Sequence, residues 1–312
     1  MITKRKAMVV LSGGQDSTTC LMWAKARYDE VHAITFDYGQ KHRAEIHSAE
    51  RVAALVGVSS HTVVNAAGML KGRSPLVNPD VQLETYTDFN SMDSTIGNRI
   101  ELTFVPLRNL LFLVIAANHA LAKDCFDLVT GVCAMDNANY PDCTEAFILS
   151  AQSTIREALG MHRPDMRSGP QIEIVTPLLF LSKAETVDLA RQFPDWEAVM
   201  AESHTCYAGS VPPCGKCHAC VLRAEGFRQA GVADPLVEKW HVLGGVLKGE
   251  IKQPTGMTMG RLSELEENWQ DLSRQPAEAA KATSEFGSTN DEVRADEPKA
   301  DPLTDTEGGS PD

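Results

Sequence analysis

Five short apolar runs recur along the first two thirds of the chain, and polar or helically patterned segments separate them. Apolar, partly β-branched runs of this length are typical of strands buried on both faces of a sheet. They cover residues 7–11, 31–36, 61–65, 127–132 and 172–175. Residues 41–56 place apolar side chains at the spacing of one helix face, and Gly57 then ends that helix. The alternation of strand and helix predicts an α/β fold with a doubly wound parallel sheet.

Further helices are predicted from residue 16 onward and at residues 110–122, 144–159 and 217–231. Another begins at residues 182–185, where Ser-Lys-Ala-Glu forms a capping box. Between Gly72 and Arg99 no period is visible, and Pro, Asn, Asp, Ser and Gly are frequent. A long insert of this kind is usually either functional or disordered. We interpret it as a mobile flap over the substrate.

The stretch MVVLSGGQDSTTCL, residues 8–21, organises the rest of the chain. It has the pattern of a strand, a sharp glycine turn and a helix N-terminus. Successive backbone N–H groups and the positive end of the helix dipole favour an anion at such a place. Gly13 and Gly14 let the backbone approach phosphates without a Cβ, and Ser12 and Ser17 add hydroxyl donors. The stretch predicts a pyrophosphate site; the plainer alternative is a glycine-rich turn that opens a helix.

This motif differs from the two better-known phosphate loops. No lysine follows the glycines as G-x-x-x-x-G-K-[ST] requires, and the glycines are not spaced as in G-x-G-x-x-G. The motif resembles instead the S-G-G-x-D-S signature of the PP-loop ATP pyrophosphatase superfamily. The resemblance implies a HUP-like fold in which ATP is cleaved between its α and β phosphates, and in which Asp16 helps to hold Mg²⁺. The implied ATP-binding residues are Leu11, Ser12, Gly13, Gly14, Gln15, Asp16, Ser17, Thr18, Thr19, Cys20 and Leu21.

The composition changes toward the C-terminus. From Asp271 to Asp312 there are eleven Asp or Glu against four Lys or Arg, which accounts for −7 of the chain's formal net charge of −13. This tail is also rich in Pro, Ser, Thr, Gly and Ala, so disorder is predicted. We therefore expect a PP-loop α/β domain at 1–200, a C-terminal zinc-binding helical region at 201–250 and an acidic, disordered tail at 251–312. The body is only mildly acidic, which argues against a general nucleic-acid surface.

The apolar runs are too short for a membrane span, which needs about 18 residues. Residues 1–6 lead into the first strand without the apolar core of a signal peptide. We therefore expect a cytoplasmic protein that does not enter the membrane. In that compartment the eight cysteines are expected to be reduced thiols or metal ligands rather than disulfides.

Polar residues also stand at the predicted ligand edge of the sheet. Arg108 and Asn109 begin the helix at 110–122, where they either clamp a phosphate or carboxylate or simply cap the helix. The polar loop 133–143 follows the fourth strand, at the edge where doubly wound sheets bind ligands, so it is a candidate substrate site. Lys183 lies at a helix N-terminus, which disfavours a cation; it is either a surface lysine or contacts a phosphate.

Four cysteines form the second strong pattern of the sequence. Cys206 precedes Cys214, Cys217 and Cys220, which recur at every third position. Four thiolates with C-x₂-C spacing satisfy a tetrahedral Zn²⁺ with no open position, so one structural zinc ion is predicted. An iron–sulfur cluster is the alternative, although no fourth Cys-Pro follows. Buried apolar positions are expected for Cys20, Cys125 and Cys133.

With both patterns in one chain, residues 7–236 resemble the 7-cyano-7-deazaguanine synthase family of PP-loop ligases. The matching pieces include SGGQDSTTCL (12–21), FDYGQKHRAEI (36–46), TGV (130–132), YPDC (140–143), SKAE (182–185), TCY (205–207) and CGKCHACVLRAEGF (214–227). The resemblance implies that 7-carboxy-7-deazaguanine, ammonia and ATP give 7-cyano-7-deazaguanine, in queuosine or deazapurine biosynthesis. Adenylylation gives the carboxylate a leaving group, ammonia then forms the amide, and a second activation of the amide oxygen yields the nitrile. The resemblance also implies a homodimer.

Resemblance and loop position together suggest individual roles. The catalytic candidates are Asp16, Ser17, Arg108, Asp142 and Lys183. The substrate-binding candidates are Arg108, Asn109, Asp136, Asn137, Tyr140 and Asp142. Asp142 is further expected to bind ammonium or to take its proton.

The chain departs from the family's pattern at two places on this edge. Leu107 stands where the family usually has the glycine of Pro-Gly-Arg-Asn, and Ala138-Asn139 stand where the loop often has Ser-Gly. A glycine that adopts a special backbone angle is not simply replaced by leucine. Two alternatives therefore stay open: a relative that passes the activated acid to a protein or nucleic-acid amine, and a PP-loop enzyme that modifies tRNA. A zinc module without enzymatic activity is the plainest alternative.

Overall fold

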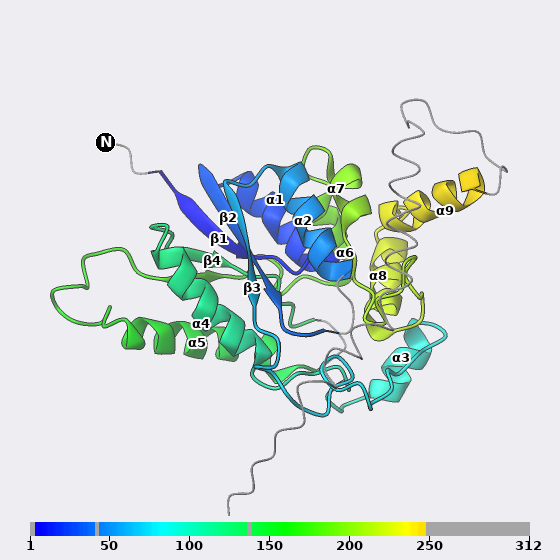
Figure 1. The fold of residues 1–312 in the computed structure, drawn as a ribbon, viewed down its shortest axis with the longest axis horizontal. Helices are drawn as coiled ribbons and strands as arrows, with labels where there is room; N and C mark the ends of the chain where they lie inside the picture. The colour runs from blue at the N-terminus through cyan, green and yellow to red at the C-terminus, as the bar shows by residue number, and fades with distance from the viewer. Residues whose placement is uncertain (1–3, 41–43, 136–138, 248–312) are drawn as a thin grey trace, which may run out of the picture. The chain divides into compact units, whose positions relative to one another are not determined.

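A single parallel sheet forms the centre of the computed structural model, which describes residues 4–40, 44–135 and 139–247 (Figure 1). Its strands are β1 (Lys6–Val10), β2 (Glu30–Asp37), β3 (Ser60–Asn65), β4 (Asp127–Val129) and β5 (Glu173–Val175). They are arranged in the order β3-β2-β1-β4-β5, and every pair is parallel. The predicted doubly wound parallel sheet is therefore confirmed. β4 is shorter than predicted, because residues 130–132 leave the sheet after Val129.

The described part of the chain also contains nine α-helices and one short 3₁₀ helix, of which α6 to α9 follow the last strand. The α-helices are α1 (Gln15–Lys25), α2 (Ala44–Val56), α3 (Phe89–Ile96), α4 (Arg108–Leu121), α5 (Glu145–Ala158), α6 (Lys183–Ala190), α7 (Trp196–Glu202), α8 (His218–Gln229) and α9 (Pro235–Leu247). The 3₁₀ helix η1 covers Pro141–Cys143. Within the described residues, no helix is both long and apolar enough to cross a membrane.

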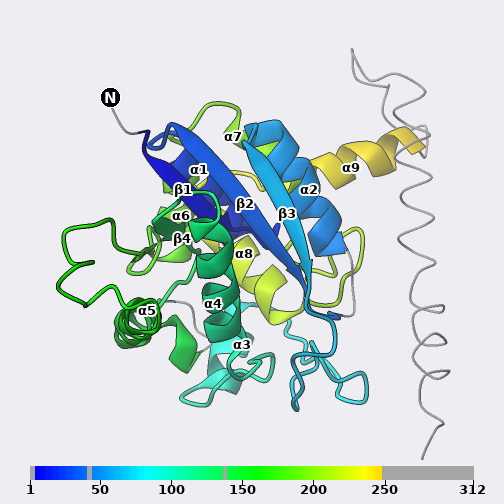
Figure 2. The same cartoon turned by 60° about the vertical axis from the view of Figure 1, so that its left-hand side comes forward.

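The helices cover both faces of the sheet, and each face has its own apolar core. Met8, Ile34 and Leu128 point to the face covered by α4 and α5. Val9 and Ala33 point to the opposite face, which α1, α2, α6 and α7 cover (Figure 2). Neighbouring residues of one strand thus enter different cores, as the pleat of a strand requires. This two-sided burial explains why the strands are nearly continuous apolar runs.

The segment between Gly72 and Arg99 is not structureless, so that prediction is wrong. It contains α3, whose first turn is closed by a capping box: Ser91 donates its backbone N–H to Asp88 Oδ1 at 2.8 Å, and Asp88 donates its own to Ser91 Oγ at 3.3 Å. Met92 and Ile96 are buried against α8. The spacing of these two apolar residues, four apart, was the available signal. Whether the segment moves over a ligand stays a prediction.

Leu107 gives α4 an unusual start. Its φ is 63° and its ψ is 4°, which is the left-handed region that favours glycine. The side chain is 69% exposed, so little packing compensates for the backbone strain. The leucine therefore adopts a backbone conformation that favours glycine.

We expect Leu107→Gly to stabilise the protein by about 0.5–1 kcal/mol. Glycine has no Cβ, so it removes about 1–2 kcal/mol of backbone strain from the folded state. Its greater conformational freedom in the unfolded chain reduces this stabilisation by about 0.5–1 kcal/mol. The midpoint of urea unfolding measures the difference. Leu107→Ala is the matched control, because alanine keeps the Cβ and the strain; equal gains for both variants would contradict this explanation.

Candidate active site

The predicted strand, glycine loop and helix N-terminus are present at residues 6–25. β1 ends at Val10, and α1 begins at Gln15 with Gly14 as its N-cap. Ser17 Oγ accepts from the Ser12 N–H at 3.2 Å and donates to the Gly14 carbonyl at 3.1 Å, so the loop is held by its own hydroxyl. The loop lies between β1 and β4, which are not consecutive in the chain, and ligands of open α/β sheets bind at such a switch point.

Gly13 is held from two sides. A Cβ at this position would lie 2.4 Å from the Glu45 carbonyl oxygen and 2.6 Å from the Ala49 backbone nitrogen, and its φ is +86°. The Gly13 carbonyl accepts from His204 N–H at 2.7 Å and from Ser48 Oγ at 2.9 Å. The loop is therefore packed between α2 and the segment that follows α7.

A cavity of about 530 Å³ opens beside this loop, within the usual size range of small-molecule sites. Four parts of the chain line it: the PP-loop, the end of β2 with the start of α2, the segment after β4, and the start of α4 with residues 139–144. Thr205 and Tyr207 complete the wall. The cavity thus joins the predicted nucleotide loop to the predicted substrate edge.

The structure brings only part of the predicted nucleotide-binding set to the cavity. The residues that line it are Leu11, Ser12, Gly14, Gln15, Asp16 and Ser17. The others are Gly13, which is packed behind the loop, and Thr18, Thr19, Cys20 and Leu21, whose side chains are fully buried in α1. We therefore expect these buried residues to support the loop rather than to touch a ligand.

Lys183 pairs with the loop's carboxylate. Its Nζ lies 2.7 Å from Asp16 Oδ2, and its side chain is only 10% exposed. The predicted capping box of α6 is present, with Ser182 and Glu185 as partners, so it places Lys183 in the first helical turn. Gly226 of α8 passes so close that a Cβ there would lie 2.9 Å from Lys183 Cβ. Lys183 is therefore held in place and is not a free surface lysine.

Arg108 lines the cavity amid acidic and phenolic groups. Burial lowers the pKa of its guanidinium. The opposite effect is larger and comes from four neighbouring groups, Tyr38, Tyr207, Tyr140 and Asp142, so the net pKa lies above its ordinary value. The guanidinium therefore keeps its positive charge at the wall of the cavity. Such a cation is suited to a carboxylate or a phosphate.

The other substrate-side candidates are arranged around Arg108. Asn109 Nδ2 donates to the Asp142 carbonyl at 3.1 Å. Tyr140 lines the cavity, and its hydroxyl donates to Glu101 at 3.1 Å. Asp142 is 7% exposed and is not among the lining residues; burial raises the pKa of its carboxyl, against the lowering effect of Arg108. Asp136 and Asn137 lie outside the described residues.

Glu45 and Tyr207 also line the cavity and received no individual role from the sequence, whereas Tyr38 belongs to the turn 37–40, which its position after β2 predicts to border the nucleotide. Burial raises the pKa of Glu45 to about 7, although Arg108 opposes the shift. Tyr38 and Glu45 fall in the stretch that follows β2, at the ligand edge of the sheet. That position was the available signal. An acidic residue in a first helical turn is otherwise ordinary.

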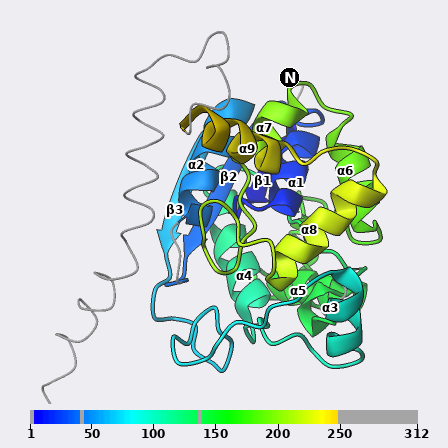
Figure 3. The ribbon, with the colours of Figure 1, turned by 90° about the vertical axis from the view of Figure 1, so that its right-hand side faces the viewer.

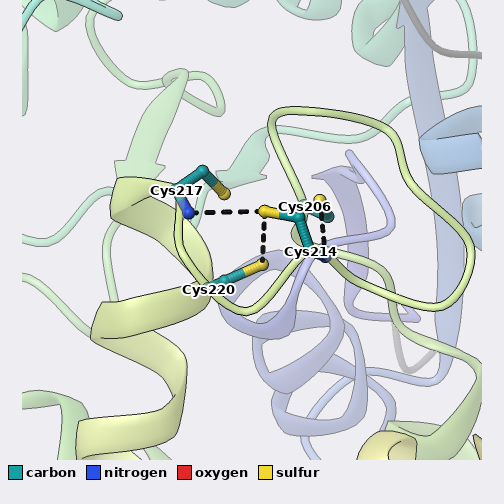
Figure 4. A group of neighbouring side chains, drawn as sticks. All are labelled: Cys206, Cys214, Cys217 and Cys220. Atoms are coloured by element: carbon teal, nitrogen blue, oxygen red, sulfur yellow. Dashed lines mark hydrogen bonds between the residues drawn. The ribbon is translucent and has the colours of Figure 1, made fainter. Parts of the chain in front are cut away.

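The four predicted metal ligands do come together (Figure 4). The Sγ atoms of Cys206, Cys214, Cys217 and Cys220 all lie within 4.8 Å of one another. Tetrahedral coordination at about 2.3 Å per bond would place the sulfurs about 3.8 Å apart, so the cluster fits a single metal ion. Backbone N–H groups of Cys214 and Cys217 point at neighbouring sulfurs at 3.4 and 3.3 Å. Cys20, Cys125 and Cys133 are buried thiols outside the cluster, as predicted.

Arg223 connects this cluster to the PP-loop. It lies one turn after Cys220 on α8, the helix that Figure 3 shows from the side. Its guanidinium makes two hydrogen bonds to Asp234, at 2.6 and 2.8 Å. The same guanidinium donates to Ser203 Oγ at 2.8 Å and to Thr205 Oγ1 at 3.0 Å. His204 lies between these two residues and donates its backbone N–H to the Gly13 carbonyl. α8, which begins at the cysteine cluster, therefore fixes the segment 203–205 that packs against the PP-loop.

The sheet order, the loop at its switch point and the adjoining cavity define an α/β nucleotide-binding protein of the PP-loop class. The family described as "Queuosine biosynthesis protein QueC" matches residues 6–231. A protein of Gloeobacter violaceus named 7-cyano-7-deazaguanine synthase is 45% identical, over 74% of this chain and 95% of its own. The chain belongs to the 7-cyano-7-deazaguanine synthase family.

Two further relatives agree with this assignment. Proteins of Chromobacterium violaceum and Laribacter hongkongensis carry the same name and are 48% and 46% identical, each over 75% of this chain and 94% of the relative. Solved structures are more distant. A 4-thiouridine synthetase in complex with RNA and ATP is 19% identical with a TM-score of 0.38, over 76% of this chain and 53% of that chain, which is too low to add to the assignment.

We expect Gly13→Ala to destabilise the protein far more than Gly57→Ala. Both glycines have a left-handed φ, of +86° and +70°, so alanine at either position costs about 1–2 kcal/mol. A Cβ at Gly57 meets nothing within 4 Å, whereas at Gly13 it meets backbone atoms of α2, which adds about 1–3 kcal/mol of overpacking. Chemical unfolding measures both free energies, and equal losses would contradict the packing described here.

Removal of metal from the cysteine cluster should loosen the PP-loop as well as the cluster. We expect the melting temperature to fall by roughly 5–10 °C, as a loss of about 2–3 kcal/mol would produce, and ATP binding to weaken. Thermal unfolding and calorimetric ATP titration before chelation, after it and after metal is restored measure both effects. Cys214→Ser should abolish metal binding, whereas Cys143→Ser should retain it; unchanged ATP affinity in the metal-free protein would contradict the connection through Arg223.

Proposed function

We propose that this protein is an ATP-dependent ligase that converts 7-carboxy-7-deazaguanine and ammonia into 7-cyano-7-deazaguanine, a step of queuosine biosynthesis. The observation that carries the proposal is the pairing of family membership over residues 6–231 with one cavity that contains both the PP-loop and Arg108. The relatives matched over nearly their whole length carry the name of this synthase.

The chemistry follows from the poor leaving group of a carboxylate. Transfer of AMP to one carboxylate oxygen makes that oxygen a good leaving group, and ammonia then displaces AMP to form the amide. Transfer of a second AMP to the amide oxygen lets the nitrogen form the triple bond while AMP departs. Each carboxylate oxygen therefore leaves on an AMP, and two pyrophosphates are released. A single nucleotide loop next to a single substrate site serves both halves.

The loop residues divide this work between phosphate binding and charge. The backbone N–H groups of Ser12 to Ser17 and the two serine hydroxyls would bind the phosphates, because the helix N-terminus favours an anion there. Asp16 is a suitable oxygen ligand for Mg²⁺, which would neutralise phosphate charge. Lys183 then has two partners within reach, Asp16 and a phosphate. On this account the ion pair at 2.7 Å positions Lys183 before the nucleotide arrives.

The substrate side is assigned to the start of α4 and the loop that follows β4. Arg108 would bind the substrate carboxylate, and Asn109 supports the backbone of Asp142. Tyr140 would contact the deazaguanine ring, and Asp142 would act through Arg108 because its own side chain does not line the cavity. Asp136 and Asn137 stay substrate-side predictions outside the described residues.

The two departures from the family's pattern include two residues with a backbone conformation that favours glycine. Leu107 has a φ of 63° and Asn139 a φ of 54°, both in the left-handed region. Asn139 also donates to the carbonyls of Gly97 and Arg99, each at 2.9 Å, so it ties the loop to the end of the α3 segment. Because Leu107 and Asn139 both adopt a conformation that glycine adopts readily, we favour ammonia as the acceptor over a protein or nucleic-acid amine.

Further parts of the proposal concern the metal, the assembly and the chain's division. Four thiolates without an open position favour a structural Zn²⁺ over a catalytic ion. The family resemblance supports a homodimer, and a cytoplasmic location would supply ATP and keep the thiols reduced. The division into a catalytic domain at 1–200, a cysteine region at 201–250 and a tail at 251–312 is likewise proposed.

The first experiment incubates the purified protein with ATP, Mg²⁺, ammonium and 7-carboxy-7-deazaguanine, and identifies small-molecule products by mass spectrometry. We expect the nitrile, with two AMP and two pyrophosphates for each molecule formed. AMP release without nitrile or amide would mean that the acceptor is another amine, and a tRNA substrate would then be tested. A reaction without the acid is the control, and no acid-dependent AMP release would overturn the proposal.

A further inference from the structure

The proposed reaction requires a base close to the reacting nitrogen, and this inference therefore rests on the proposed function. Ammonia carries three protons and the nitrile nitrogen carries none, so one proton leaves when the amide forms and two leave when the nitrile forms. Ammonium, the main species at neutral pH, has a fourth proton to lose. A positioned base at such steps contributes about 10²–10⁴-fold to the rate.

Few described residues that line the cavity can take these protons. Asp16 and Glu45 are the carboxylates among them, and no histidine is present in that described set. Asp16 is held by Lys183 at 2.7 Å and belongs to the phosphate loop. Asp142, the sequence-based candidate for this role, is buried outside the lining.

The tyrosines around the cavity are unsuited to the role at neutral pH. Burial raises the pKa of Tyr38 to about 12 and raises those of Tyr140 and Tyr207 well above their ordinary value. All three therefore stay protonated. The thiol of Cys133 donates to the Leu181 carbonyl at 3.1 Å, and Asn109 Nδ2 donates to Cys143 Sγ at 3.6 Å. Glu45 is the group left with a carboxylate and no phosphate-loop partner in these contacts.

The position of Glu45 suits a reaction at the border of the two half-sites. It lies in the first turn of α2, and its own carbonyl oxygen is the atom nearest to where a Cβ on Gly13 would lie. Its carboxyl interacts electrostatically with Arg108, the residue assigned to the substrate carboxylate. Glu45 thus lines the same cavity as the loop that would deliver AMP and the cation that would hold the acid.

We propose that Glu45 is the general base that removes protons from the reacting nitrogen in both halves of the reaction. In the first half, nitrogen bonds to the acyl carbon, one N–H proton passes to the Glu45 carboxylate, and AMP leaves with the carboxylate oxygen. In the second half, the adenylylated amide gives up its remaining N–H protons, the C≡N bond forms, and AMP leaves with the second oxygen. Glu45 returns its proton to solvent between transfers, so no other reactant is consumed.

The surroundings of Glu45 bring its proton affinity to the range that this role needs. Burial is the main cause that raises the pKa of its carboxyl to about 7, Arg108 lowers it, and Cys206 raises it. Among the described residues, Tyr38 and Tyr207 also interact with it, and both are neutral at this pH. A base with a pKa near the working pH is deprotonated often enough to act and still holds a proton well. Activity that depends on Glu45 should therefore rise with pH through about 7.

The test compares Glu45→Gln with wild type, and Glu50→Gln, an exposed change on the same helix, is the matched control. We expect Glu45→Gln to keep acid-dependent ATP–pyrophosphate exchange within about threefold, because adenylylation removes no proton from nitrogen. Amide and nitrile formation from ammonium should fall by about 100-fold, without the rise of kcat through pH 7. Hydroxylamine, which is largely uncharged at neutral pH, should restore acyl transfer as the hydroxamate. Nitrile formation from the supplied amide should stay low.

The alternatives give different results. A Glu45→Gln variant that forms nitrile at near wild-type rate, or keeps the wild-type pH profile, overturns the inference. A raised KM for the acid with unchanged kcat also overturns the inference and assigns Glu45 to recognition of the substrate ring. A parallel loss of ATP–pyrophosphate exchange, hydroxamate formation and thermal stability overturns it as well and assigns Glu45 a structural role. Failure of the wild type to form nitrile is a failure of the proposed function and is seen before any variant is compared.

Discussion

The close approach at Gly13 is the constraint on which the site depends. Its carbonyl accepts hydrogen bonds from His204 N–H and Ser48 Oγ, and its missing side chain leaves room for the backbone of α2. Three segments that are far apart in the chain can meet there only because one residue has no Cβ and tolerates a left-handed φ. The meeting places the first turn of α2, and with it Glu45, against the nucleotide loop.

The other elements hold this meeting point from outside. The parallel sheet brings the ends of β1, β2 and β4 to one edge, as expected for a switch point. Arg223 fixes the segment on both sides of His204, and the cysteine cluster fixes the start of the helix that carries Arg223. The cysteine cluster is therefore connected to the nucleotide loop although it lies outside the cavity lining.

Sequence patterns predicted the elements whose signals are local. Strand runs, the S-G-G-x-D-S loop and the capping box of α6 each depend on adjacent residues, and the structure has them where expected. α3 was missed because its cap uses Asp and Ser and its apolar side consists of few residues. The predicted ligand edge borders the cavity, but Glu45 and Tyr207 were not singled out there. Their part in the site depends on packing between segments that are not adjacent in the chain, and a pattern of neighbouring residues does not encode such packing.

The contact between His204 and Gly13 also bears on the order in which the protein is made. The first strand and the glycine loop leave the ribosome early, yet the donor that fixes the loop's carbonyl belongs to residue 204, and the partner of Arg223 is residue 234. A nascent chain that ends before these residues has the motif without its supports. Synthesis of nearly the whole described chain must therefore precede a finished nucleotide site, and a truncated product would carry an intact motif with an incomplete loop.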